Sequence, residues 1–175
     1  NNVALVNGRP ELLNLKDLIH HFVEHRHDVV VKRTNFELKK AEQRAHILEG
    51  LIIASDNIDD VIDLIKKSSN ADEARQKLEK KYKLSETQAK AIIEMRLRQL
   101  TGLEQNKLRE EYDDLQKTIK GYKDLLDSKS KRMNLIKEEL ADIKEKYGDE
   151  RRSEIEYAGG DFRVEDIIPN EKVVI

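Results

Sequence analysis

Apolar side chains recur at alternating steps of four and three over residues 108–147, and this period constrains the fold more than any other feature of the chain. A heptad repeat makes a narrow apolar seam, which is covered only when a second helix packs along it. We therefore predict a coiled coil. Gly121 and the segment DSKSK at 127–131 are weak helix formers, so a kink or short break is expected there, and Gly148 should end the helix. The predicted seam residues are Leu108, Tyr112, Leu115, Ile119, Tyr122, Leu126, Met133, Ile136, Leu140 and Ile143.

Residues 15–45 supply the predicted partner helix. From Leu15 to about Ala54 the chain has no proline and a single glycine, Gly50, and its apolar residues follow helical spacing. An unbroken helix of this length would measure about 60 Å. Because a helical segment lies between the two long helices, they can pack only antiparallel. The predicted seam on this side is Leu15, Leu18, Phe22 and Val29.

From Ala45 onward the sequence becomes apolar almost all round, which is typical of a helix that enters a core. Residues 46–103 are therefore predicted to form a small helical domain at the tip of the arm. Capping signals divide it into helices at about 58–67, 71–83 and 86–100, begun by Asn57 or Ser55, by Asn70, and by Ser85 with Gln88. Thr101 and Gly102 should end the last of these helices.

The fold class that follows is mainly α, a long antiparallel coiled-coil arm with a small helical globular domain at its tip and short β segments at the chain ends. Asn7-Gly8 between two apolar runs predicts a hairpin in residues 1–14 at the root of the arm. Residues 104–147 form the returning helices with a break near 127–131. Residues 148–175 form a tail with β character around a Gly-Gly turn.

Charge and composition exclude several classes of function. The net charge of −2 gives no overall attraction to nucleic acid, although residues 1–45 hold eight Lys or Arg against six acidic residues. Without cysteine the chain has no disulfide or thiolate chemistry, which fits a reducing cytoplasm. No apolar run approaches the roughly 20 residues of a membrane span, so no membrane is expected among the partners. The abrupt ends suggest a piece of a larger protein.

Four of the five histidines fall in HHFVEHRHDVV at 20–30, and His21 and His25 share one helical face. A metal site needs further ligands. The nearest carboxylates, Asp17, Glu24 and Asp28, are of kinds found on any charged helix, so we interpret the histidines as polar residues that flank the stalk. Three of the five tyrosines, Tyr112, Tyr122 and Tyr147, lie on the predicted heptad seam, where packing explains them. Tyr82 and Tyr157 have no neighbouring base or cation cluster that would activate a phenol. The sequence therefore predicts no catalytic, cofactor-binding or metal-binding residue.

The segment SETQAKAIIEMRLRQLTGLE at 85–104 shows two apolar faces. Ala89, Ile93, Leu97 and Leu100 form one face, which the domain itself can cover. The second face indicates a partner, and a two-fold homodimer is the simplest partner. Complete burial of both faces in the same domain would produce the same pattern. The predicted dimer interface is Gln88, Ala91, Ile92, Met95 and Gln99.

Three stretches resemble the A subunits of bacterial DNA gyrase, in the C-terminal part of the breakage-reunion region. They are KRTNFELKKAEQRAHILEGLIIASDNIDDVIDLIKKS at 32–68, LSETQAKAIIEMRLRQLTGLEQNKL at 84–108 and YGDERRSEI at 147–155. The related subunits of topoisomerase IV are the nearest alternative, but RAHILEGL after FELKKAEQ is more similar to gyrase. His25-Arg26 lies where the family helix commonly has a His-Arg pair, on the stalk.

The resemblance implies an exit gate, in which a coiled-coil arm ends in a domain that dimerises below the transported DNA duplex. The parent enzyme would be an ATP-dependent type II topoisomerase, an isomerase of the bacterial cytoplasm and nucleoid, with gyrase B, ATP and Mg²⁺ as partners and cofactors. The family's DNA-cleaving tyrosine lies upstream of these residues, so this chain alone should be inactive. Contact with passing DNA should be weak and salt-sensitive.

Two hypotheses from other classes stay open. A free-standing coiled-coil arm that binds another protein or RNA predicts a monomer with a basic stripe. A metal-dependent enzyme that uses the histidines predicts tight metal binding, which would be lost when His21 and His25 are changed to Ala.

Overall fold

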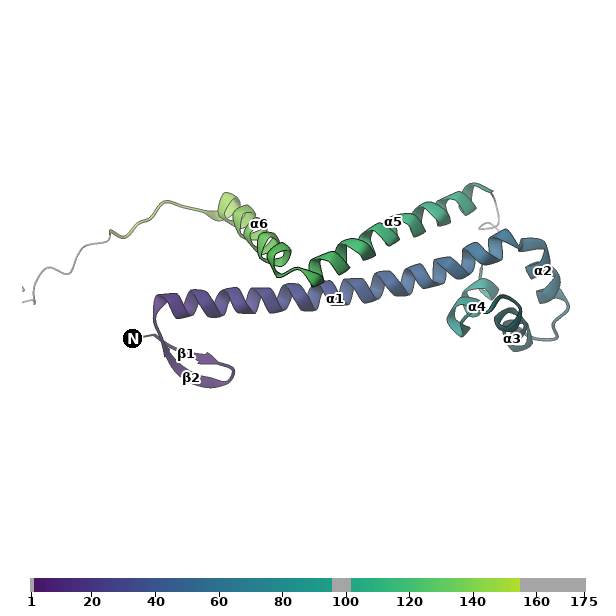
Figure 1. Ribbon diagram of the computed structural model, residues 1–175, viewed down its shortest axis with the longest axis horizontal. Coiled ribbons are helices and arrows are strands. Elements are labelled where there is room, and N and C mark those ends of the chain that lie inside the picture. Colours follow the sequence, from purple (N-terminus) through teal and green to yellow (C-terminus); the bar gives the residue numbers. More distant parts are fainter. Residues whose placement is uncertain (1, 96–101, 155–175) are drawn as a thin grey trace, which may run out of the picture. The chain divides into compact units, whose positions relative to one another are not determined.

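A computed structural model describes residues 2–95 and 102–154 (Figure 1). One unit spans Asn1–Leu140 and a second spans Ala141–Ile175. The described residues are mainly helical, as predicted, and the sheet among them is a two-stranded antiparallel hairpin. No described helix has a stretch long and apolar enough to cross a membrane.

The hairpin joins β1 (Asn2–Val6) to β2 (Arg9–Leu13), with Val6 paired to Arg9. Its two-residue turn has positive φ at both positions, 50° at Asn7 and 80° at Gly8. Positive φ at both central residues defines the type I′ turn that Asn-Gly favours, because its twist matches that of the strands. The hairpin predicted in residues 1–14 is confirmed.

Helix α1 spans Leu15–Asp56 without interruption, about 63 Å at 1.5 Å per residue. Its first turn is closed by a capping box that was not predicted. The side chain of Asn14 accepts a hydrogen bond from the Asp17 amide at 2.9 Å, and the Asp17 carboxylate accepts one from the Asn14 amide at 3.2 Å. These bonds satisfy two amides that would otherwise lack partners at the helix start.

Three short helices follow in the first unit: α2 (Ile58–Lys66), α3 (Ala71–Tyr82) and α4 (Glu86–Ile93). Figure 1 shows them at the carboxyl end of α1, and α4 contacts both α1 and α3. Their shared core is the tip cluster, whose buried members are Leu48, Leu51, Ala54, Val61, Leu78, Leu84, Ala89 and Ile92.

The predicted caps have different outcomes. Asn70 caps α3, and Ser85 with Gln88 forms the predicted capping box of α4. Asn57 precedes α2 but makes no capping bond with its side chain, which donates instead to the Ile53 carbonyl at the end of α1. The predicted start of α2 is confirmed, but the capping bond predicted for Asn57 is wrong, because the same amide can serve the helix before it or the helix after it.

Helix α4 is shorter than the predicted 86–100 and ends at Ile93. The Met95 amide donates to the Ile92 carbonyl at 3.2 Å, an i to i−3 bond of the kind that tightens a last helical turn. Residues 96–101 lie outside the described residues, and the next helix, α5 (Gly102–Asp127), begins at the glycine that we expected to follow a helix end.

Helix α6 (Lys129–Tyr147) follows α5 after a break at Ser128, inside the predicted range. Ser128 begins α6, since its hydroxyl accepts from the Lys131 amide at 3.3 Å and its carbonyl from the Arg132 amide at 3.2 Å. The second expected weak point, Gly121, lies inside continuous α5. In the second unit, α6 ends before Gly148, as predicted.

Helices α1 and α5 pack antiparallel. The partners of successive α5 residues move back along α1, from Arg109 with Asp56, through Glu111 with Arg44, to Lys123 with Glu42. Ile119 is buried with two small α1 residues, and Tyr112 and Leu115 pack against the same cluster. The half-buried seam residues are Leu108, Tyr112, Leu115, Tyr122, Leu126, Met133 and Leu140, with Ile119 and Ile136 fully buried.

On α1 the predicted seam is partly wrong. Leu15 is 72% exposed and Phe22 is 49% exposed, while Leu18 and Val29 are half-buried. The fully buried positions of this helix nearer its middle are Val30, Thr34, Ala41 and Ala45. The reason is that α5, with 26 residues against 42 in α1, ends before the first turns of α1, and α6, which follows it, does not pack extensively against α1. On α6, in the second unit, Ile143 is 51% exposed.

The predicted β character of the tail is not found in residues 148–154, which hold neither helix nor strand. The remainder of that prediction, 155–175, lies outside the described residues.

Candidate functional site

Gln88, predicted at the dimer interface, joins α4 to α1 within the chain. It is only 5% exposed, and its side-chain amide donates to the His46 carbonyl at 2.8 Å. Its carbonyl oxygen accepts from the Ser85 amide at 2.9 Å. The helices approach closely there: a Cβ added at Gly50 would lie 2.7 Å from the Gln88 Cβ. Glycine at position 50 therefore lets α4 dock on α1.

Ile92 is likewise internal. It is 2% exposed and belongs to the tip cluster. Gln88 and Ile92 therefore present no surface to a second molecule in this structure, which favours, for these two residues, the alternative of burial in the same domain. Ala91 and Met95 are half-buried and pack against the tip cluster. Of the predicted interface residues, Ala91 and Met95 therefore stay as candidates for a contact with a second molecule. Gln99 lies outside the described residues.

A contact between His46 and Ser85 was not predicted. The His46 Nε2 lies 2.7 Å from the Ser85 hydroxyl oxygen, so the residue that caps α4 also contacts α1. No local pattern signals this contact, because the two residues lie 39 positions apart.

A second polar group joins α2 to α3 within the tip domain. Tyr82 donates to the Asp60 carboxylate, which also pairs with Lys81. Burial of the phenol is the main cause that raises the pKa of Tyr82 to about 12, and the hydrogen bond to Asp60 adds to it. The Lys81 and Tyr82 bonds lower the pKa of Asp60. A raised phenol pKa is the opposite of what a tyrosine nucleophile needs. The bonds of Asp60 to Tyr82 and Lys81 link α2 to α3.

The arm contains a bridge that was not predicted either. Glu139 of α6 accepts from Arg26 at 2.6 Å and from Arg33 at 2.5 Å, two α1 residues that lie two turns apart. Its bond to Arg33, with the charges of both arginines, lowers the pKa of Glu139. Each arginine binds a separate carboxylate oxygen, so the bridge fixes the register of α6 on α1.

Arg132 connects the break between α5 and α6 to α1. Its guanidinium donates to the carbonyls of Leu125 and Leu126, at the end of α5, and to His27 Nε2 at 2.9 Å. A cation is favoured at a helix carboxyl end, where the last carbonyls lack partners. Arg132 therefore connects the end of α5 and His27 of α1 across the expected break.

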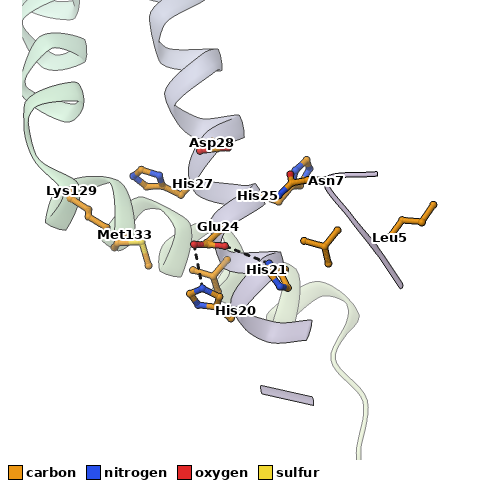
Figure 2. Close-up of a pocket in the computed structure, with 12 residues that line it drawn as sticks. Leu5, Asn7, His20, His21, Glu24, His25, His27, Asp28, Lys129 and Met133 are labelled. Carbon is orange, nitrogen blue, oxygen red and sulfur yellow. Dashed lines mark ion pairs between the residues drawn. The ribbon is translucent and has the colours of Figure 1, made fainter. Parts of the chain in front are cut away.

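The histidines line a groove of about 700 Å³ between the hairpin, α1 and α6 (Figure 2). His20 and His21 both lie against Glu24, at 3.2 and 3.5 Å, whereas His25 and His27 point to opposite sides of α1. In residues 2–95 and 102–154 we find no group of three or more potential ligands that could hold a metal ion. The metal-enzyme hypothesis finds no support in this geometry.

These features define a class of mainly α-helical protein in which two long antiparallel helices, α1 and α5, lead to and from a small helical domain. Residues 1–141 match the family model that describes the A subunits of DNA gyrase and topoisomerase IV. The chain belongs to that family.

The relatives agree with this assignment. The chain is 49% identical to the DNA gyrase A protein of Staphylococcus epidermidis over 176 aligned positions and 50% identical to that of Clostridium acetobutylicum over 175. It is 49% identical to that of Ureaplasma parvum over 176. Each alignment covers all of this chain but only 20–21% of the relative, so the chain spans about a fifth of the length of these proteins.

Proposed function

We propose that this chain is the exit-gate dimerisation module of a DNA gyrase A protein. The observation that supports it best is a helical core at the end of the α1–α5 pair, where Ala91 on α4 and Met95, two residues beyond the end of α4, are half-exposed. Family membership and about half identity to gyrase A proteins over the whole chain add to this support. The corresponding part of topoisomerase IV is the alternative within the family.

The whole enzyme would be a type II topoisomerase that passes one DNA duplex through a double-strand break and changes supercoiling. This chain would supply the gate, while cleavage, ATP hydrolysis and the Mg²⁺ and ATP sites would belong to gyrase B and to the rest of gyrase A. The enzyme would work in the bacterial cytoplasm.

The geometry suggests how such a gate would work. Two copies of the surface formed by α4 and the residues just after it would meet around a two-fold axis, so that Ala91 and Met95 contact their own symmetry mates. A surface this narrow buries little area, which favours reversible closure over permanent association. The break between α5 and α6 at Ser128, next to the hydrogen bonds of Arg132, would be where the arm bends as the gate opens.

Light scattering coupled to size exclusion tests this proposal on a dilution series of the 175-residue chain and its Met95→Asp variant. We expect a wild-type dimer that dissociates only at low concentration, and a folded monomer for the variant, because burying an unpaired carboxylate at a dimer contact is costly. Circular dichroism would check that the variant keeps its helices.

The matched control is Leu64→Asp on α2, because Leu64 also packs, half-buried, against the tip cluster but lies on another helix. A dimeric control beside a monomeric Met95→Asp would support the α4 contact. Helical monomers for both variants would contradict that contact. A wild-type monomer at every concentration would contradict the module and favour the binding-arm hypothesis.

A further inference from the structure

Phe36 is 65% exposed in the middle of α1, on the helix face turned away from α5. The residues of this stretch that are buried, Val30, Thr34 and Ala41, lie about 120–160° from Phe36 at 100° per residue. Phe36 therefore takes no part in the contact with α5. A single exposed apolar side chain is common and needs no explanation by itself. Phe36 differs from such residues because lysine side chains lie around it on the same face of the helix.

Three lysines surround this ring. Lys32 and Lys40 lie about 40° from Phe36 and Lys39 about 60° from it, one turn before or after it along the helix. All three are exposed. We name Lys32, Phe36, Lys39 and Lys40 the basic face of α1.

On the same helix the carboxylate nearest to the centre of this face is Asp28, about 80° from Phe36 and one turn before Lys32. Glu37 lies about 100° and Glu42 about 120° from Phe36, and Glu42 pairs with Lys123 of α5. Arg33, at the edge of the face, is held by Glu139. Within the described part of the chain, by contrast, Lys32, Lys39 and Lys40 form no ion pair. Their charge is therefore available to an external anion.

We propose that the basic face of α1 binds the phosphate backbone of double-stranded DNA. Lys32 and Lys40 are eight residues apart, about 12 Å along the helix axis, which is comparable to the roughly 12 Å width of the major groove. Two lysines at this spacing reach phosphates on both strands that border one groove. Lys39 adds a contact at one edge, and the Phe36 ring lies between them, against sugars and base edges.

This inference deepens the proposed function and rests on it only for the choice of DNA as the polyanion. The basic face, and the absence of ion pairs to its lysines among the described residues, stand independently of whether the chain dimerises.

The strength of the contact can be bounded. Each neutralised phosphate on duplex DNA adds about 0.9 to the slope of log affinity against log salt. Three lysines therefore contribute a slope of about 2.7, or a loss of roughly 40-fold in affinity between about 50 and 200 mM salt. Such a contact binds without sequence preference and releases easily, as a surface that passes DNA along would require.

The experiment measures binding of a fluorescent duplex of about 20 base pairs to the full chain by anisotropy, from about 25 to 200 mM salt. The test variant is Lys32→Gln/Lys39→Gln/Lys40→Gln. The control, Lys80→Gln/Lys120→Gln/Lys137→Gln, removes the same charge from exposed lysines on α3, α5 and α6. Phe36→Ala isolates the ring, and heparin serves as a polyanion without grooves.

We expect the test variant to lose at least about tenfold in affinity at about 50 mM salt and about 2 to 3 units of slope, with a small change in the control. Phe36→Ala should weaken duplex binding severalfold and leave heparin binding unchanged. Equal losses in test and control variants, or no wild-type binding at about 25 mM salt, would overturn the proposal. Heparin binding that is as tight, and as sensitive to Phe36→Ala, would overturn the choice of duplex DNA.

Light scattering on the same variants separates this inference from the proposed function. The basic face lies on the arm, so the triple variant should keep the wild-type oligomeric state. A dimer that does not bind DNA would contradict the inference alone, and a monomer that binds DNA through these lysines would contradict the gate alone.

Discussion

Gly50 and Gly121 both lie inside long helices, yet their surroundings differ. A Cβ at Gly50 would lie 2.7 Å from the Cβ and 2.8 Å from the Cγ of Gln88, atoms close to the backbone of α4. A Cβ at Gly121 would meet nothing within 4 Å. The first glycine is required by the approach of two helices, whereas the second has no such constraint.

Gly50→Ala should lower the free energy of unfolding by about 1–2 kcal/mol. The overlap with Gln88 costs about 1–3 kcal/mol, and the better helix propensity of alanine offsets up to about 1 kcal/mol of that. Gly121→Ala, the matched control, should raise it by about 0.5–1 kcal/mol. Urea unfolding followed by circular dichroism measures both, and a stabilising effect at position 50 would contradict the close approach of α1 and α4.

At the scale of elements, the register between α1 and α6 depends on Glu139. This carboxylate is the common acceptor for Arg26 and Arg33, and its side chain is 24% exposed. Because its pKa in the folded chain lies below the ordinary value of 4.5, the bridge stabilises the fold fully above that value. The stabilisation is lost as pH falls through the lowered pKa.

Glu139→Gln should therefore destabilise the chain by about 1 kcal/mol near neutral pH, and the difference from wild type should shrink as pH falls below 4.5. The neighbouring Glu138 is exposed and, among the described residues, forms no ion pair, so Glu138→Gln is the control. Unfolding free energies at several pH values decide the matter. A difference that stays constant down to acidic pH would mean that packing, and not the charge of Glu139, holds α6.

At the scale of the whole molecule, the proposed gate couples folding to association. A dimer gains about 1.4 kcal/mol for each tenfold rise in concentration, whereas a monomer gains nothing. The melting temperature is therefore a second, independent probe of the α4 surface.

The wild-type melting temperature should rise by roughly 2 °C per tenfold increase in protein concentration, given the entropy of unfolding of two chains of this length. Met95→Asp should melt at one temperature whatever the concentration, because its interface is lost. Calorimetry over a hundredfold range would show both. A concentration-independent wild type would exclude a dimer in that range.

The sequence by itself determined the features whose signals span one or two helical turns. The heptad series from Leu108 predicted α5 and its packing, Asn7-Gly8 predicted the hairpin, and Ser85 with Gln88 predicted the start of α4. Each depends on atoms a few residues apart, so the local sequence contains nearly all of the relevant interactions. The approximate limits of α1 and the break at Ser128 were predicted for the same reason.

Only the tertiary structure decided which faces are covered. Leu15 and Phe22 follow the seam pattern but are exposed, because α5 ends before it reaches them and α6 does not pack extensively against α1. Gln88 and Ile92 look like contact residues but lie inside the domain, because α4 docks at Gly50. The Glu139 bridge joins residues more than a hundred positions apart. Burial depends on how far each neighbouring helix extends and where it docks, and no periodicity within a single segment encodes either quantity.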